Sequence, residues 1–209
     1  MKIHHLLLAL SLSAPLQAAL LYDQSPPNPN AIDITNYRVA DNFILTQNST
    51  LNTIDFWYQA QFEDDLNSVT WALYTDASQS VGNLIATATA TPVTSVDSNA
   101  FLATFSLGSI TLAAGNYWLE LHSGSTLTDG SGFSVYWSAT NENPSAHARF
   151  QPSGVPNITS DSPGFQQMAF RVQGTTRGVE LDDAELPEPA TCLSLGIGLL
   201  AISVWRRIR

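Results

Sequence analysis

The stretch SVTWALYTDASQSVGNLIATATATP, residues 68–92, carries the pattern that decides the fold. Apolar side chains alternate with others over 68–76, which is typical of a β-strand that buries one face. Val69, Trp71 and Leu73 should point into a core, while Tyr74 should lie on the opposite face. The residues between 76 and 83 are of the kind that form turns, and 83–92 has strand character again. This stretch therefore predicts two consecutive strands joined by a turn.

The period of two continues on both sides of this stretch, and no segment shows a sustained helical face. Further strands are expected at 37–45, 50–60, 101–107, 115–123, 132–140 and 167–173. Loops rich in Gly, Asn, Pro and Ser separate them. Strands at this spacing predict an all-β fold, an antiparallel β-sandwich of the jelly-roll kind that spans residues 20–175.

Charge is scarce and unevenly placed in these 209 residues. Only 12% of the residues are charged, and the formal net charge is −10. Lys2, Arg206, Arg207 and Arg209 lie at the two ends. The part between them therefore has only four arginines but contains all 18 acidic residues. Phosphate binding needs clustered Lys and Arg, so we expect no nucleic-acid partner.

Residues that carry catalysis or hold metals are sparse. The single cysteine, Cys192, excludes an intramolecular disulfide and any cysteine-cluster metal site. Beyond the first twenty residues the histidines are His122 and His147, which lack the spacing of a metal motif. No nucleophile elbow is found. We therefore expect a protein that is not an enzyme, with no metal, no cofactor and no catalytic residues.

Other functions remain open as alternatives. A secreted glycan hydrolase would need two carboxylates flanking a cleft, and Glu120 with Asp55 or Asp76 is the candidate pair. An ice-binding protein would need a flat, regular threonine face, for which ATATATP at 86–92 is short. A purely structural role at the cell surface is a further alternative.

Aromatic side chains give the most specific hypothesis for the sandwich. Alternation places Ile54, Phe56 and Tyr58 in the core, with Tyr117, Leu119, Leu121, Phe133, Val135 and Trp137. The remaining rings, beside carboxylates and amides on one sheet face, could stack on sugars and hydrogen bond to them. The candidate glycan-binding residues are Trp57, Tyr74, Trp118, Glu120, His122 and Tyr136. The alternative is that loops cover these rings, or that they lie between the two sheets.

The first 19 residues have the features of a signal peptide. Lys2 precedes an apolar run from Leu6 to about Leu12, Pro15 breaks the helix, and Ala18 or Ala19 offers a small residue for cleavage. The run is too short to span a bilayer stably. We therefore expect export.

The C-terminal part of the sequence contains an acidic linker, 176–186, and an uncharged run, 190–205. As a helix this run would reach about 24 Å, close to the roughly 30 Å of the hydrocarbon layer. Arginines at its end would stay in the cytoplasm by the positive-inside rule, while the sandwich would lie outside. We expect a transmembrane helix here.

Residues 187–209 combine Pro187-Glu188-Pro189, Ala190-Thr191, the expected short glycine-containing helix and the basic end RRIR at the C-terminus. This combination resembles the PEP-CTERM sorting domain of Gram-negative bacteria. It implies transient arrest in the inner membrane and cleavage by an exosortase near Glu188, with delivery to the cell surface or an extracellular exopolysaccharide matrix. The residues that carry it are Pro187, Glu188, Pro189, Ala190, Thr191, Arg206, Arg207 and Arg209.

The sandwich segment is also similar to a β-sandwich that recurs in PEP-CTERM proteins. The shared patterns are ADNF, IDFW, VTWALYTD followed by VGNLIA, ITLAAGNYWLELHSG, and VYW. They are mostly core and turn patterns, so they imply the fold more than an activity. We therefore expect an exported, non-enzymatic surface or matrix protein, processed by an exosortase, with exopolysaccharide as the ligand to test.

Overall fold

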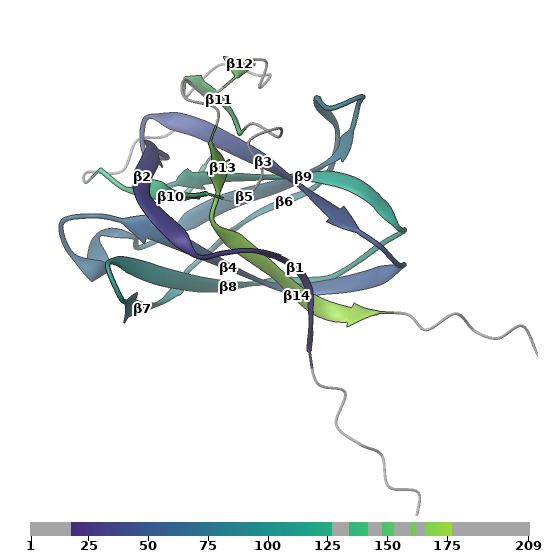
Figure 1. The fold of residues 1–209 in the computed structure, drawn as a ribbon, viewed down its shortest axis with the longest axis horizontal. Coiled ribbons are helices and arrows are strands. Elements are labelled where there is room, and N and C mark those ends of the chain that lie inside the picture. The colour runs from purple at the N-terminus through teal and green to yellow at the C-terminus, as the bar shows by residue number, and fades with distance from the viewer. Residues whose placement is uncertain (1–17, 127–133, 142–147, 153–159, 162–165, 177–209) are drawn as a thin grey trace, which may run out of the picture. The chain divides into compact units, whose positions relative to one another are not determined.

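The computed structural model describes residues 18–126, 134–141, 148–152, 160–161 and 166–176, and over these residues the fold is all-β. Two antiparallel sheets face each other, as the prediction of a β-sandwich requires (Figure 1). The described part of the chain contains no α-helix, only a short 3-10 helix, η1 (Glu63–Asp65). Residues 1–17 of the expected signal peptide and the sorting segment, 187–209, lie outside the described residues.

The first sheet has eight strands among the described residues. Its central order is β1 (Ala19–Gln24), β14 (Phe170–Thr176), β4 (Ser49–Gln59), β10 (Tyr136–Thr140) and β13 (Gln167–Met168). Strand β2 (Pro27–Asp33) pairs with β10, β8 (Ala100–Leu112) pairs with β4, and β7 (Val93–Asp97) pairs with β8.

The second sheet has six strands in the described residues. Their order is β12 (Ser160–Asp161), β11 (Arg149–Pro152), β3 (Tyr37–Leu45), β9 (Gly115–Ser123), β5 (Val69–Asp76) and β6 (Val81–Ala90). The strand pair predicted from 68–92 is therefore β5 and β6, with Trp71 opposite Ala88.

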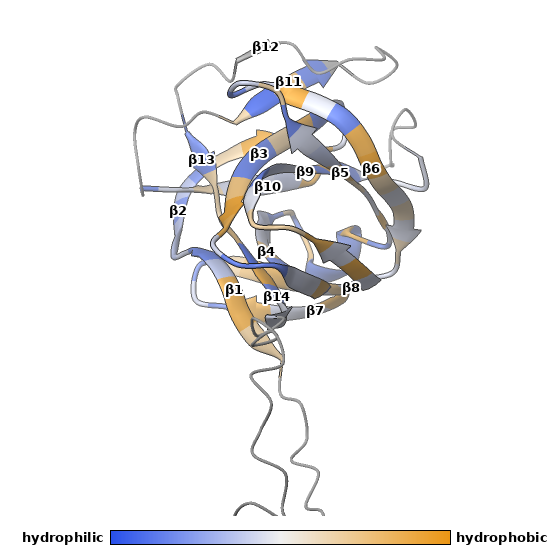
Figure 2. Cartoon of the chain, turned by 90° about the vertical axis from the view of Figure 1, so that its right-hand side faces the viewer, coloured by the Kyte–Doolittle hydropathy of each residue, from blue (hydrophilic) through white to orange (hydrophobic). Residues whose placement is uncertain are grey.

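The predicted alternation is confirmed in the core. Val69, Trp71 and Leu73 of β5 join one buried cluster. The inward side chains of β4, β9 and β10, with Val135 just before β10, belong to the same cluster: Ile54, Phe56, Tyr58, Leu119, Leu121, Val135 and Trp137 are buried, and Tyr117 packs against them. Phe133, also predicted for the core, lies outside the described residues. Hydrophobic and hydrophilic residues follow each other along single strands such as β3, as Figure 2 shows.

One inward position of β3 is a carboxylate. Asp41 is fully buried between Val39 and Phe43, which belong to the core cluster. Its Oδ2 accepts the backbone N–H of Met168 at 2.6 Å and the amide of Gln24 at 3.2 Å, both from the first sheet. Asp41 therefore ties the two sheets together with polar contacts inside an apolar core.

The start of β1 and the end of β14 lie at the same end of the first sheet. Ala19 pairs with Gly174, and Thr176 pairs with Ser49 at the beginning of β4. Gly174 is required at this point, because a Cβ there would lie 2.0 Å from the carbonyl oxygen of Thr50. The other end of β4, at Gln59, lies on the order of 30 Å away along the strand.

Candidate functional site

The six candidate glycan-binding residues lie on the outer sides of their strands, but on two different sheets. Trp57 and Tyr136 belong to the first sheet. The second sheet carries Tyr74, Trp118, Glu120 and His122. The outer faces of a sandwich point away from each other. The expectation of one shared binding face is therefore corrected. Alternation predicts which side of its own strand a residue lies on, but it does not predict which strands belong to the same sheet.

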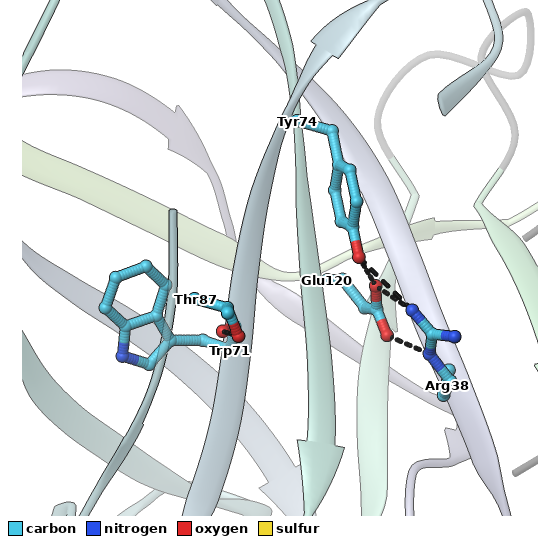
Figure 3. Close-up of polar contacts among 5 residues, drawn as sticks. All are labelled: Arg38, Trp71, Tyr74, Thr87 and Glu120. Atoms are coloured by element: carbon cyan, nitrogen blue, oxygen red, sulfur yellow. Dashed lines mark hydrogen bonds and ion pairs between the residues drawn. The ribbon is translucent and has the colours of Figure 1, made fainter. Parts of the chain in front are cut away.

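On the second sheet, Glu120 is the centre of a buried polar cluster (Figure 3). The Arg38 guanidinium donates to both carboxylate oxygens, from Nε at 2.5 Å and from Nη2 at 3.0 Å. The Tyr74 hydroxyl donates to Oε2 at 2.6 Å. Burial, followed by the charge of Glu120, raises the pKa of Tyr74 above its ordinary value. Both oxygens of Glu120 are thus occupied by protein donors, and the side chain is 0% exposed.

Trp118 and His122 are buried on the same face of β9. The Trp118 indole donates to Asp76 Oδ1 at 2.8 Å, and the Arg149 guanidinium lies 5.6 Å from the ring centroid. These contacts leave Trp118 2% exposed, so its ring offers no open surface on which a sugar could stack. The expected stacking role of Trp118 is therefore corrected, because distant side chains cover the outer face of β9.

The carboxylate pair of a glycan hydrolase is not assembled among the described residues. Asp55 lies on the first sheet, where it accepts Thr104 Oγ1 at 2.7 Å, whereas Glu120 lies on the second. Asp76 shares a sheet with Glu120, but its carboxylate binds the Trp118 indole. Neither candidate partner therefore flanks a cleft together with Glu120.

The first sheet does form a pocket, of about 370 Å³, at the end of β4 that carries Gln59. Its walls come from segments far apart in the sequence. They are the β1–β2 connection, the start of β2, the end of β4, the β7–β8 turn and β14, which supply Ser25, Pro26, Pro27, Asn28, Pro29, Trp57, Gln59, Asp97, Ser98, Asn99, Ala100 and Arg171. This volume is near the lower end of the ~300–1,000 Å³ of ligand pockets.

A second pocket, of about 330 Å³, adjoins the first. Both are lined by Gln59, Ser98, Asn99 and Ala100, and the second adds Ala60, Val96 and Phe101. We call the two pockets together the β4-end groove. The first pocket contains the prolines, Trp57, Asp97 and Arg171, and the second contains Val96 and Phe101.

Trp57 forms the buried base of this groove. Its indole donates to Asp97 Oδ2 at 2.7 Å, and the Arg171 guanidinium lies over the ring, 4.6 Å from the centroid. Arg171 also donates to Asp23 at 3.3 Å and to Ser25 at 3.4 Å. Because Trp57 is only 2% exposed, it holds the groove together and leaves little of its own ring open.

Several groups at the groove remain available for a ligand. Within the described residues the Asn99 side chain makes no hydrogen bond, and Gln59 uses only its amide nitrogen, on the carbonyl of Pro29 at 3.2 Å. Tyr136 lies opposite Gln59 across the β4–β10 pair, so its ring is on the same face. It is 37% exposed, the most accessible ring of the six candidates.

Most groove residues were missed from the sequence. The predicted strands included neither Pro26–Pro29 nor Asp97–Ala100, and they included Arg171 only as one position of 167–173. Only strand pairing in three dimensions places these segments beside Trp57. Of the predicted set, the structure brings Trp57 into the groove and Tyr136 next to it.

The threonines of β6 do not present a free row of hydroxyls. Thr87 donates to the carbonyl of Trp71 at 2.7 Å (Figure 3), and Thr89 donates to the carbonyl of Ser125 at 2.9 Å. Ice binding by this strand therefore has no support in the geometry. In the part of the chain that the structure describes, no group of three or more His, Cys, Asp or Glu side chains could hold a metal ion. Among the same described residues, no helix has the length and apolarity needed to cross a membrane.

Comparison with known proteins leaves the chain without an assigned family. No family model matches it. No curated protein matches it either.

Proposed function

We propose that this chain is an exported, non-enzymatic protein of the cell surface or extracellular matrix that binds polysaccharide in the β4-end groove. The observation that carries the proposal is the groove itself: two adjoining pockets that share a rim of amide and hydroxyl side chains. Gln59, Ser98 and Asn99 offer the donors and acceptors that sugar hydroxyls need, and the exposed Tyr136 ring lies beside them.

The proposed route begins with the signal peptide, 1–19, and ends with the sorting segment, 187–209, cut by an exosortase after transient insertion of its helix in the inner membrane. The placement of the strands supports this route. Strand β1 begins at Ala19, and β14 ends at Thr176, at the same end of the jelly-roll-like sandwich. Both processing segments would then be attached at the end of β4 opposite the groove. A tethered protein would keep its binding surface free.

Retention on polysaccharide tests the binding proposal. The secreted protein is mixed with insoluble exopolysaccharide from the producing cells, and the bound fraction is measured against protein concentration. Gln59→Ala combined with Asn99→Ala removes two rim amides and should weaken retention at least tenfold. The control is Asn116→Ala, an exposed amide on the second sheet. Equal retention of the rim variant and the control would contradict the proposal, and release of reducing sugar would indicate a hydrolase instead.

Mass spectrometry of the secreted protein tests the processing proposal separately. The expected product lacks residues 1–19 and everything that follows the Pro187–Pro189 motif. A secreted protein that still ends in SVWRRIR would contradict exosortase cleavage.

A further inference from the structure

We propose that the β4-end groove selects uncharged polysaccharide chains and excludes polyanionic ones such as polyuronates. This inference rests on the proposed function and names the class of ligand. It is carried by the charges that the fold gathers at the groove from separate strands.

Arg171 is the cation of the groove lining among the described residues, and carboxylates of the protein offset its charge. It is paired across strands with Asp23 on one side and Asp55 on the other. Its Nε donates to Asp23 at 3.3 Å, and its face lies on Trp57. Nε and Nη2 thus already have protein acceptors, and a carboxylate of the protein lies against the guanidinium before any ligand binds. Side chains of opposite strands lie about 5 Å apart, so both carboxylates offset its charge.

Asp97 adds a negative charge inside the lining. Its Oδ2 accepts the Trp57 indole, while its Oδ1 has only the weak contact from Ser98 at 3.4 Å. This oxygen can accept a hydrogen bond from a sugar hydroxyl. It would repel a sugar carboxylate in the same place.

A further group of acids lies next to β7, the strand that supplies Val96 to the second pocket. The helix η1 contributes Glu63, Asp64 and Asp65 and packs against β7. Tyr58, whose ring lies 5.3 Å from that of the lining residue Phe101, donates its hydroxyl to the Glu63 carbonyl. Burial raises the pKa of Tyr58 to about 12, and the three acidic side chains add to this effect. Their field thus reaches the aromatic wall of the groove.

Carboxylates therefore outnumber guanidinium groups in this region: Asp97 lies in the lining with Arg171, Asp23 and Asp55 lie on the strands beside Arg171, and Glu63, Asp64 and Asp65 lie next to β7. A focused field of one sign changes the local concentration of a charged ligand severalfold or more, and salt screens it. A polymer with many carboxylates should be repelled at low ionic strength, whereas a neutral polymer should be indifferent to salt.

The test compares the same sugar chain with and without its charge. Exopolysaccharide from the producing cells is separated by anion exchange into a neutral and an acidic fraction. Part of the acidic fraction is chemically reduced, so that its uronate carboxylates become alcohols. We expect the neutral and the reduced fractions to retain the secreted protein. The unreduced acidic fraction should bind at least tenfold more weakly in 10 mM salt, and the difference should shrink in 1 M salt.

Charge variants separate electrostatics from contact. Glu63→Gln with Asp64→Asn alters neither pocket lining and should strengthen binding to the acidic fraction severalfold, with binding to the neutral fraction unchanged. Asp182→Asn with Asp183→Asn makes the same change of charge in the 176–186 segment. This control should leave binding to both the acidic and the neutral fraction unchanged. Tighter binding of the unreduced acidic fraction at low salt would overturn this inference and leave the proposed function standing. Failure of all fractions to bind would overturn both.

Discussion

The Arg38–Glu120 pair gives the sharpest test of the structure. We consider Arg38→Met, which keeps the aliphatic stem and removes the charge. Glu120 would keep its Tyr74 bond but lose both guanidinium contacts, at 2.5 and 3.0 Å, while remaining fully buried. Removing one partner of a buried ion pair costs about 3–5 kcal/mol, because the other charge stays uncompensated.

The assay is thermal unfolding followed by tryptophan fluorescence. In a domain of this size 1 kcal/mol corresponds to roughly 2–4 °C, so Tm should fall by about 6 to 20 °C. Removing all polar members together, by Arg38→Met, Glu120→Leu and Tyr74→Phe, should recover most of that loss, since a buried ion pair gains little over apolar packing.

Two outcomes would refute this reasoning. If Arg38→Met lowered Tm by less than about 2 °C, Glu120 would not be a buried charge that depends on Arg38. If the triple variant were less stable than Arg38→Met alone, the polar cluster would stabilise the fold by more than the pairing of its own charges. Polysaccharide retention by the triple variant should match the parent protein, because the cluster is not on the groove sheet.

Three further predictions concern the core. Burial raises the pKa of Asp41 to about 7 against the opposing donors of Met168, Asn42 and Gln24. The folded protein thus keeps a proton that the unfolded chain releases, and its unfolding free energy should fall as pH rises from about 4 to 7. Melts of Asp41→Asn across this range should lack that component, and identical slopes would contradict it. Gly174→Ala should cost about 1–3 kcal/mol in a urea titration, because the new Cβ meets the Thr50 carbonyl at 2.0 Å; an unchanged midpoint would show that the β14–β4 contact is looser than described. Trp137→Phe should cost about 0.5–1.5 kcal/mol by the same titration, since the carbonyl of Ala169 loses its indole donor at 3.0 Å and keeps only the longer bond from the Trp57 N–H at 3.3 Å; a cost near zero would mean that water or another donor replaces the indole.

Strands β2, β11 and β12 were not predicted from the sequence, and the failures have a common physical reason. Strand β2 contains Pro27 and Pro29, and proline cannot donate to a ladder, so the segment reads as a loop. It is nevertheless a strand, because β10 pairs with it at Ala31 and Ile32. The terminal pair β11 and β12 is too short to show a period of two. Pairing with an existing sheet creates such strands, and a local pattern does not contain that information.

The sandwich and the side of each strand that faces the core were determined by the sequence alone. Side-chain direction alternates along a strand, so Trp71 or Trp137 is assigned to a face from its immediate neighbours. What covers an outer face depends on residues far along the chain. Trp57 is closed over by Asp97 and Arg171, and neither lies near it in the sequence. Only the tertiary structure could therefore decide that the predicted rings are mostly buried, and that the start of β2 and the β7–β8 turn build the groove beside Trp57.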